Sequence, residues 1–109
     1  MDKIDHIAVA VTDISAALNW YRANFELNTI YSDESWALIE FENVRLALVL
    51  PEQHPPHFAV EKDNLKEFEP LNSHRDGTKS VYIDDPWGNV IELIETKSPA
   101  VKNKTSMNA

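Results

Sequence analysis

Two stretches of this chain repeat one pattern, and this duplication constrains the fold more than any other feature of the sequence. Each stretch opens with a strand-like segment that carries an early histidine, DHIAV at residues 5–9 and PHFAV at 56–60. Each closes with an apolar segment, RLALV at 45–49 and VIELI at 90–94. A duplicated unit that cannot cover its own sheet face needs its copy, either in the same chain or in a neighbour.

Hydrophobic periodicity predicts the elements of both halves. In the first half we expect a strand at 4–11, a helix at 14–25 that follows an N-cap at Thr12-Asp13, and strands at 27–31, 36–41 and 45–50. The second half is expected to hold a strand at 57–61, a short helix at 63–68, a loop at 71–78, and strands at 79–83 and 90–95. The prolines of PEQHPP at 51–56 cannot continue a helix or a central strand, so this segment is expected to be a linker.

Length and composition fit one small globular domain. We expect a single domain at 1–96, built from modules at about 1–50 and 57–96, and a mobile polar tail at 97–109. The chain has 109 residues, no cysteine and a formal net charge of -8, and an acidic body repels nucleic acid. No apolar run reaches the length of a membrane span, and the N-terminus enters a strand pattern directly, so a cytoplasmic location is expected.

Strand alternation places three potential metal ligands on one face of the predicted sheet. This front face carries His6, His57 and Glu92, and its intervening positions are often alanine, which leaves room for a cavity. Two imidazoles and one carboxylate suit Fe, Mn, Ni or Zn as divalent ions, and the other coordination positions would be open to water or substrate. The alternative is that these side chains are ordinary core or surface residues.

The sequence resembles the vicinal oxygen chelate superfamily, which includes glyoxalase I, extradiol dioxygenases and bleomycin-resistance proteins. The resemblance rests on DHIAVAV at 5–11 with ALNWY at 17–21, on PHFAV at 56–60 and on SVYIDDPWGNVIEL at 80–93. It implies an α+β fold in which paired βαβββ modules form an open, barrel-like sheet around a cleft, with helices on the outer face. It also implies a homodimer related by twofold symmetry.

The same resemblance implies that His6, His57 and Glu92 are the metal ligands. Some members add a fourth ligand on the last strand of the first module, where this chain has Ala47, which cannot coordinate. This departs from the glyoxalase I pattern and is closer to the thiol transferases and extradiol enzymes. The second module is also shorter than the first, so the cleft is either open on that side or covered by a partner.

Other residues are predicted to serve catalysis or substrate binding. Tyr82 is a candidate proton donor or substrate hydrogen-bond donor, and Glu40 a candidate general base. Candidates for substrate binding are Arg45, Trp36, Ser80 and Arg75. The competing interpretations are an Arg45 paired with an acidic residue at the rim, a Trp36 that is part of the core, and an Arg75 in a solvated loop.

Two functions of different kinds follow from these residues. The first is a metal-dependent enzyme acting on a small oxygen-chelating substrate, with lyase, isomerase, thiol-transfer or ring-cleavage chemistry left open. The second is a metal-free protein of the bleomycin-resistance type that sequesters an aromatic or cationic molecule in a dimer cleft. A partner subunit without a small-molecule site is a third interpretation, which two histidines and a glutamate on one face disfavour.

Overall fold

A computed structural model describes residues 1–68, 70–73 and 78–95 of the chain. The chain divides into two compact units. The N-terminal unit is Ile4–Phe58, and the C-terminal unit comprises Met1–Lys3 and the described residues from Ala59 onward. The tail expected at 97–109 lies outside the described residues.

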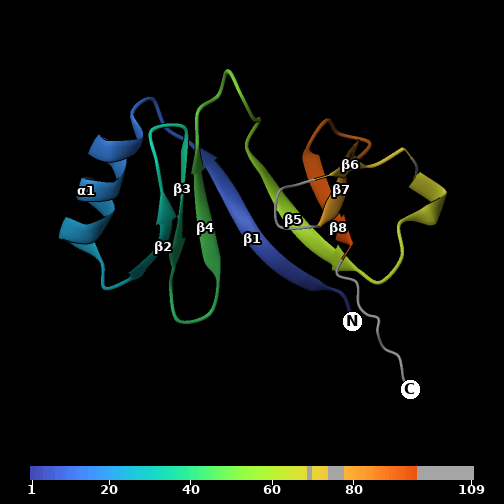
Figure 1. The fold of residues 1–109 in the computed structure, drawn as a ribbon, viewed down its shortest axis with the longest axis horizontal. Helices are drawn as coiled ribbons and strands as arrows, with labels where there is room; N and C mark the ends of the chain where they lie inside the picture. The colour runs from blue at the N-terminus through green and yellow to red at the C-terminus, as the bar shows by residue number, and fades with distance from the viewer. Residues whose placement is uncertain (69, 74–77, 96–109) are drawn as a thin grey trace. The chain divides into compact units, whose positions relative to one another are not determined.

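The N-terminal unit has the β-α-β-β-β order predicted from its periodicity (Figure 1). Its elements are β1 (Lys3–Ala10), α1 (Ile14–Asn24), β2 (Asn28–Ser32), β3 (Trp36–Glu40) and β4 (Arg45–Val49). Strand β1 pairs in parallel with β4, while β4 with β3 and β3 with β2 are antiparallel, which gives the order β2-β3-β4-β1. The parallel β1–β4 pair is possible because the helix and two strands lie between them in the chain.

Helix α1 covers one face of this sheet. Asp13 caps its N-terminus by accepting a hydrogen bond from the Ala16 amide at 3.0 Å, as the sequence predicts. The buried side chains of α1 and the sheet form one core, which consists of Ile14, Leu18, Ala37, Ile39 and Leu48. The predicted aliphatic back face is therefore confirmed for this unit.

The opposite face of the same sheet is lined by small side chains. Ala8, Ala47 and Val49 are buried there, with Leu38 packed against them. Ala8 lies opposite Ala47 in the β1–β4 pair, and Leu38 lies opposite Ala47 in the β3–β4 pair. Because strand side chains alternate between faces, His6 shares the face of Ala8.

The C-terminal unit repeats this plan with its helix reduced. Its elements are β5 (His57–Lys62, of which His57 and Phe58 belong to the N-terminal unit), the 3₁₀ turn η1 (Lys66–Phe68), β6 (Asn72–Ser73), β7 (Lys79–Asp84) and β8 (Val90–Glu95), in the order β5-β8-β7-β6. The helix expected at 63–68 is only this turn, in which the Asn64 side chain accepts from the Lys66 amide. Strand β6 lies in a segment predicted to be loop, because two residues leave no periodic signal.

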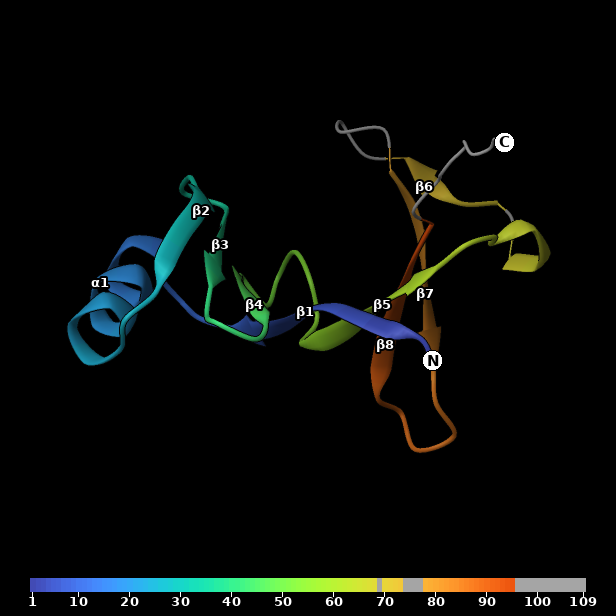
Figure 2. The same cartoon turned by 90° about the horizontal axis from the view of Figure 1, so that it is seen from below.

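The turn between β7 and β8 explains the DPWGN motif at 85–89 (Figure 2). Asp85 Oδ1 accepts from the amides of Trp87 and Asn89, and Oδ2 accepts from the Asn89 side chain. Gly88 has a φ of 88°, in the left-handed region that favours glycine. The motif is thus a turn that fixes the register of β7 and β8, and it places Tyr82 opposite Glu92.

These two units confirm an α+β fold built from two related modules. Among the described residues, α1 is the α-helix and η1 replaces a helix in the second module. None of the described helices has the length and apolar character needed to cross a membrane.

Candidate functional site

Two of the predicted ligands meet within the N-terminal unit. His6 lies on β1, and His57 is the first residue of β5. Their ring centroids are 5.7 Å apart, with the ring planes at 74°. His57 is only 8% exposed, so its imidazole lies in a largely desolvated position.

The linker fixes the ring of His57. Its Nδ1 lies 2.7 Å from the carbonyl oxygen of Pro55. A carbonyl oxygen can only accept, so Nδ1 carries the proton and donates it. In the neutral form of this ring the lone pair is on Nε2, the nitrogen through which such a histidine binds a metal.

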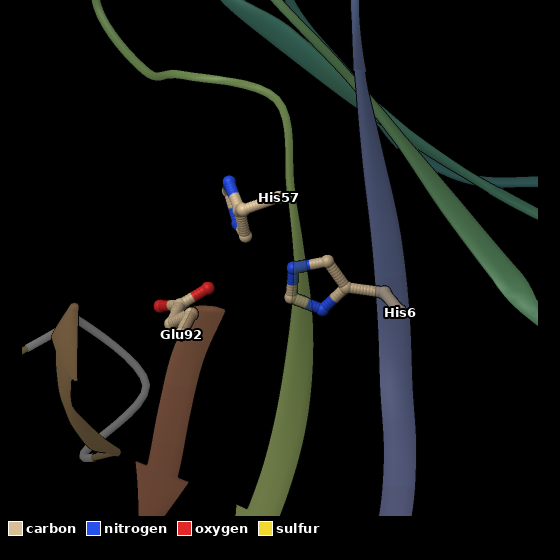
Figure 3. Close-up of side chains that lie close together, drawn as sticks. All are labelled: His6, His57 and Glu92. Carbon is tan, nitrogen blue, oxygen red and sulfur yellow. The ribbon is translucent and has the colours of Figure 1, made fainter. Parts of the chain in front are cut away.

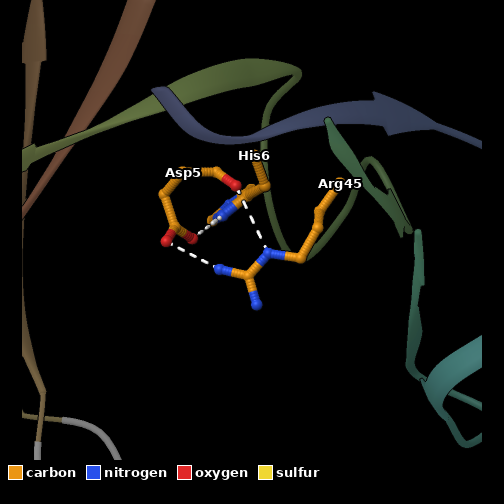
Figure 4. Close-up of polar contacts among 3 residues, drawn as sticks. All are labelled: Asp5, His6 and Arg45. Carbon is orange, nitrogen blue, oxygen red and sulfur yellow. Dashed lines mark hydrogen bonds and ion pairs between the residues drawn. The ribbon is translucent and has the colours of Figure 1, made fainter. Parts of the chain in front are cut away.

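A carboxylate fixes the ring of His6 in the same way (Figure 4). Its Nδ1 lies 2.8 Å from Asp5 Oδ2, and the other carboxylate oxygen of Asp5 accepts from Arg45 Nη2 at 2.7 Å. The hydrogen bond from His6, assisted by the charge of Arg45, lowers the pKa of Asp5 below its usual value although burial opposes the shift. An ionised carboxylate only accepts, so Nδ1 of His6 is the donor, and in the neutral form of the ring the lone pair is on Nε2.

The third predicted ligand, Glu92, lies on β8 in the C-terminal unit. Its side chain is 6% exposed, a degree of burial that is costly for a carboxylate without partners. Figure 3 draws the three side chains, with His6 on β1, His57 on β5 and Glu92 on β8. Strand β8 is the neighbour of β5 in the strand order of this unit.

Tyr82 and Ser80 share the sheet face of Glu92, as the sequence predicts. Tyr82 lies opposite Glu92 in the β7–β8 pair, and Ser80, fully buried, lies opposite Ile94. Burial, together with the negative charge of Glu92, raises the pKa of Tyr82 to about 12. The phenol is therefore protonated at neutral pH and has a hydrogen to donate.

Three other predicted residues lie on the N-terminal unit, and their proposed roles stay predictions. Arg45 forms an ion pair with Asp5, and pairing with an acidic residue is the alternative to substrate binding that the sequence offers. Trp36 is half-buried, with its ring centroid 4.9 Å from that of Tyr31. Glu40 is exposed and lies 3.5 Å from the Asn28 side chain, in a groove that Arg22 also lines. Arg75 lies outside the described residues.

The two histidines of the N-terminal unit fit a divalent transition metal. His6 and His57 each offer one imidazole nitrogen as a ligand atom. Both imidazoles hold an oxygen acceptor at Nδ1, which is the usual arrangement around metal-binding histidines. Imidazole nitrogens suit Fe, Mn, Ni or Zn as divalent ions.

Sequence reasoning missed the two groups that orient the histidines. Asp5 stands directly before His6, and Pro55 stands two residues before His57. A carboxylate adjacent to a predicted metal-binding histidine was a usable signal for Asp5. The backbone carbonyl of Pro55 has no side-chain signature, so no pattern of residue types could identify it.

Several solved structures share the fold of this chain. A hypothetical protein from Bacillus halodurans C-125 matches with a TM-score of 0.68 and 17% identity over 91% of this chain and 97% of that one. A glyoxalase/bleomycin resistance protein/dioxygenase superfamily member from Vibrio splendidus 12B01 matches with a TM-score of 0.65 and 12% identity over 88% of this chain and 100% of that one.

An enzyme is among these similar structures. Streptomyces coelicolor methylmalonyl-CoA epimerase, in complex with 2-nitronate-propionyl-CoA, matches with a TM-score of 0.69 and 15% identity over 88% of this chain and 98% of that one. No protein-family model and no curated protein sequence matches the chain. The chain shares the fold of these structures, as expected from the resemblance of its sequence to the vicinal oxygen chelate superfamily.

Proposed function

We propose that this protein is a metal-dependent enzyme that acts on a small substrate able to chelate the metal through oxygen. The ligands in this proposal are Nε2 of His6, Nε2 of His57 and the carboxylate of Glu92. The observation that carries it is the pair of histidines 5.7 Å apart, each with Nδ1 committed to an oxygen acceptor. This is the state in which two imidazoles can share one ion.

Burial supports Glu92 as the third ligand. The carboxylate is almost fully buried, and a metal ion would balance its charge. The comparison with an epimerase of the same fold supports an enzymatic function for such a chain.

A metal bound there would supply Lewis-acid stabilisation for the negative charge that develops on a substrate oxygen. Three protein ligands leave coordination positions for the substrate, and the buried Ala47 adds no fourth ligand. The chain itself contributes Tyr82, whose phenol stays protonated and can donate a hydrogen bond or a proton to a substrate oxygen. Isomerase, lyase and thiol-transfer reactions can use this chemistry, whereas ring cleavage would also need O₂ as the oxidant and a redox-active metal.

The proposal includes a homodimer as the functional form. Ile7 on β1 and Phe58 at the start of β5 are exposed to solvent, at 38% and 36%, and by alternation both lie on the face opposite His6 and His57. Large apolar groups that gather on a surface are often covered by a partner chain. Sedimentation equilibrium of wild type and of Ile7→Lys tests this, since a dimer that uses these residues becomes a monomer in the variant, whereas a monomeric wild type refutes it.

The experiment for the metal site is a calorimetric titration of chelator-treated protein with Mn²⁺, Co²⁺, Ni²⁺ and Zn²⁺. We expect one ion per chain for at least one of these metals. Glu92→Gln is expected to weaken binding by about 100-fold or more, beyond the loss typical of outer-shell changes. Glu95→Gln is the matched control, because Glu95 lies on the same strand but on the opposite face and accepts from the Leu65 amide, a bond that glutamine can keep.

The metal-free binding protein is the alternative that the same titration tests. If wild type binds none of the four metals, or if Glu92→Gln binds them as well as Glu95→Gln does, the proposal is wrong. Tight binding of an aromatic or cationic compound, undiminished by chelator and by Glu92→Gln, would then support the alternative.

A further inference from the structure

We propose that Asp5, held in place by Arg45, is a positioning residue that fixes the tautomer and orientation of His6. This inference rests on the proposed function, because the purpose of that orientation is to present Nε2 of His6 to the metal. It assigns a role to Asp5 and gives Arg45 a role other than substrate binding.

The geometry of a strand explains why Asp5 needs Arg45. Successive residues on a strand point to opposite faces, so alternation alone would carry the carboxylate of Asp5 away from His6. The structure nevertheless places Asp5 Oδ2 2.8 Å from Nδ1 of His6. Arg45, from β4, contacts the other carboxylate oxygen of Asp5 at 2.7 Å, and its Nε lies 3.4 Å from the backbone oxygen of Asp5. The guanidinium therefore keeps the carboxylate turned toward the imidazole (Figure 4).

Partial burial makes these contacts more effective than those of an exposed ion pair. The side chain of Asp5 is 19% exposed and that of Arg45 is 39% exposed. The Asp2–Lys62 pair offers a comparison, because its N–O distance is 3.0 Å but the Asp2 side chain is 61% exposed. Exposed pairs of this kind contribute little to stability or geometry.

The two histidines differ in whether a side-chain substitution can delete the acceptor that orients the ring. His57 is oriented by a backbone carbonyl, which no side-chain substitution deletes. His6 is oriented by the Asp5 carboxylate, which Asp5→Ala deletes and Asp5→Asn replaces with a neutral oxygen acceptor. His57 is thus an internal reference for any measurement on His6.

The first measurement is the tautomer of each imidazole in metal-free protein, read from ¹⁵N chemical shifts at about pH 8.5, where a histidine of ordinary pKa is neutral. We expect both His6 and His57 of wild type to carry the proton on Nδ1. In Asp5→Ala, His6 is expected to shift to the Nε2-protonated form while His57 is unchanged. Asp5→Asn, which keeps an acceptor, is expected to retain the wild-type tautomer. An unchanged His6 in Asp5→Ala overturns the proposal.

The second measurement is the affinity for Zn²⁺ and Mn²⁺ by calorimetry at fixed pH. Asp5→Ala is expected to bind about 10–100-fold more weakly, as is typical when an outer-shell carboxylate is lost, and Asp5→Asn to fall between it and wild type. Arg45→Met is expected to weaken binding in the same direction, because it releases the Asp5 carboxylate. Asp2→Ala is the matched control and is expected to bind as wild type does.

The two measurements separate failure of this inference from failure of the proposed function. If wild type binds metal and Asp5→Ala binds it equally well, the inference is wrong while the function stands. If wild type binds no metal, the function is wrong, and the tautomer of His6 alone decides whether Asp5 orients it. Thermal unfolding of the metal-free variants shows whether a loss of affinity is only a loss of folded protein, and an affinity loss that merely follows unfolding overturns the inference.

Discussion

Tyr82 lies directly opposite Glu92 in the antiparallel β7–β8 pair, so the phenol and the buried carboxylate share one face of the sheet. Burial of the phenol, with the negative charge of Glu92, raises the pKa of Tyr82 to about 12. The two groups have different functions in the proposed enzyme. The carboxylate is a metal ligand, while the phenol stays neutral and donates a hydrogen bond.

Replacing Glu92 by glutamine is expected to lower the pKa of Tyr82 toward the ordinary value of 10.0 without reaching it, because burial continues to raise it. Absorbance of tyrosinate during alkaline titration of metal-free protein measures this, with Tyr82→Phe to assign the transition. Glu95→Gln, on the opposite face of β8, is the control and should leave the pKa where it is. A pKa of Tyr82 that is equal in wild type and Glu92→Gln would contradict the predicted coupling.

The same shift predicts how stability changes at alkaline pH. The folded-state pKa of Tyr82 is raised, so the folded protein holds this proton more tightly than the unfolded chain. The contribution to stability is fully present below about pH 10 and is lost as pH rises toward 12. The free energy of unfolding of wild type, measured with urea, should therefore fall more steeply over this interval than that of Tyr82→Phe. Parallel curves for the two proteins would refute the shift.

The Asp85 turn predicts an acid-dependent part of stability. Hydrogen bonds from the side chain and amide of Asn89 are the main causes that lower the pKa of Asp85 from its usual 3.8. The contribution is present above 3.8 and is lost as pH falls through the lower folded-state value. Asp85→Ala is expected to lower the melting temperature at pH 7, and Asp85→Asn to lower it less. Below pH 4, wild type should lose stability more steeply than Asp85→Asn, and equal slopes would contradict this account.

Leu48 tests the packing of α1 on its sheet. It is fully buried in the core that contains Ile14 and Leu18. Leu48→Ala is expected to reduce the free energy of unfolding by about 2–5 kcal/mol, because it leaves a cavity beneath the helix. Ile30→Ala, at a side chain that is 46% exposed, should cost only about 0.5 kcal/mol. Urea denaturation measures both, and similar losses would show that this core is not formed as described.

The sequence predicts the N-terminal unit more completely than the C-terminal one, because the elements of the N-terminal unit are longer and more regular. Residues 7–11 alternate between β-branched and alanine side chains, and α1 spans three turns with an N-cap at Asp13, so both elements carry strong local signals. In the second half the helix is shortened to η1, whose geometry depends on the Asn64 side chain. Such short elements are determined by individual hydrogen bonds, which periodicity does not detect.

The candidate site was only partly predictable from residue types. Alternation selects His6 and His57, whose ring centroids lie 5.7 Å apart in the N-terminal unit. The alternation pattern cannot identify the acceptor that contacts Nδ1 of each histidine. Asp5 belongs by alternation to the face opposite His6, and the acceptor at His57 is the backbone oxygen of Pro55. The pairing of Arg45 with Asp5 joins two strands far apart in sequence, and such a contact has no local signature.

The most direct test of the central claim is anomalous X-ray diffraction from crystals grown with Co²⁺ or Zn²⁺. The account predicts one strong anomalous peak per chain, coordinated by Nε2 of His6, Nε2 of His57 and a carboxylate oxygen of Glu92, at metal–ligand distances of about 2.0–2.2 Å for Zn²⁺. A peak coordinated by other residues, or the lack of any peak at these three side chains in metal-saturated crystals, would contradict it.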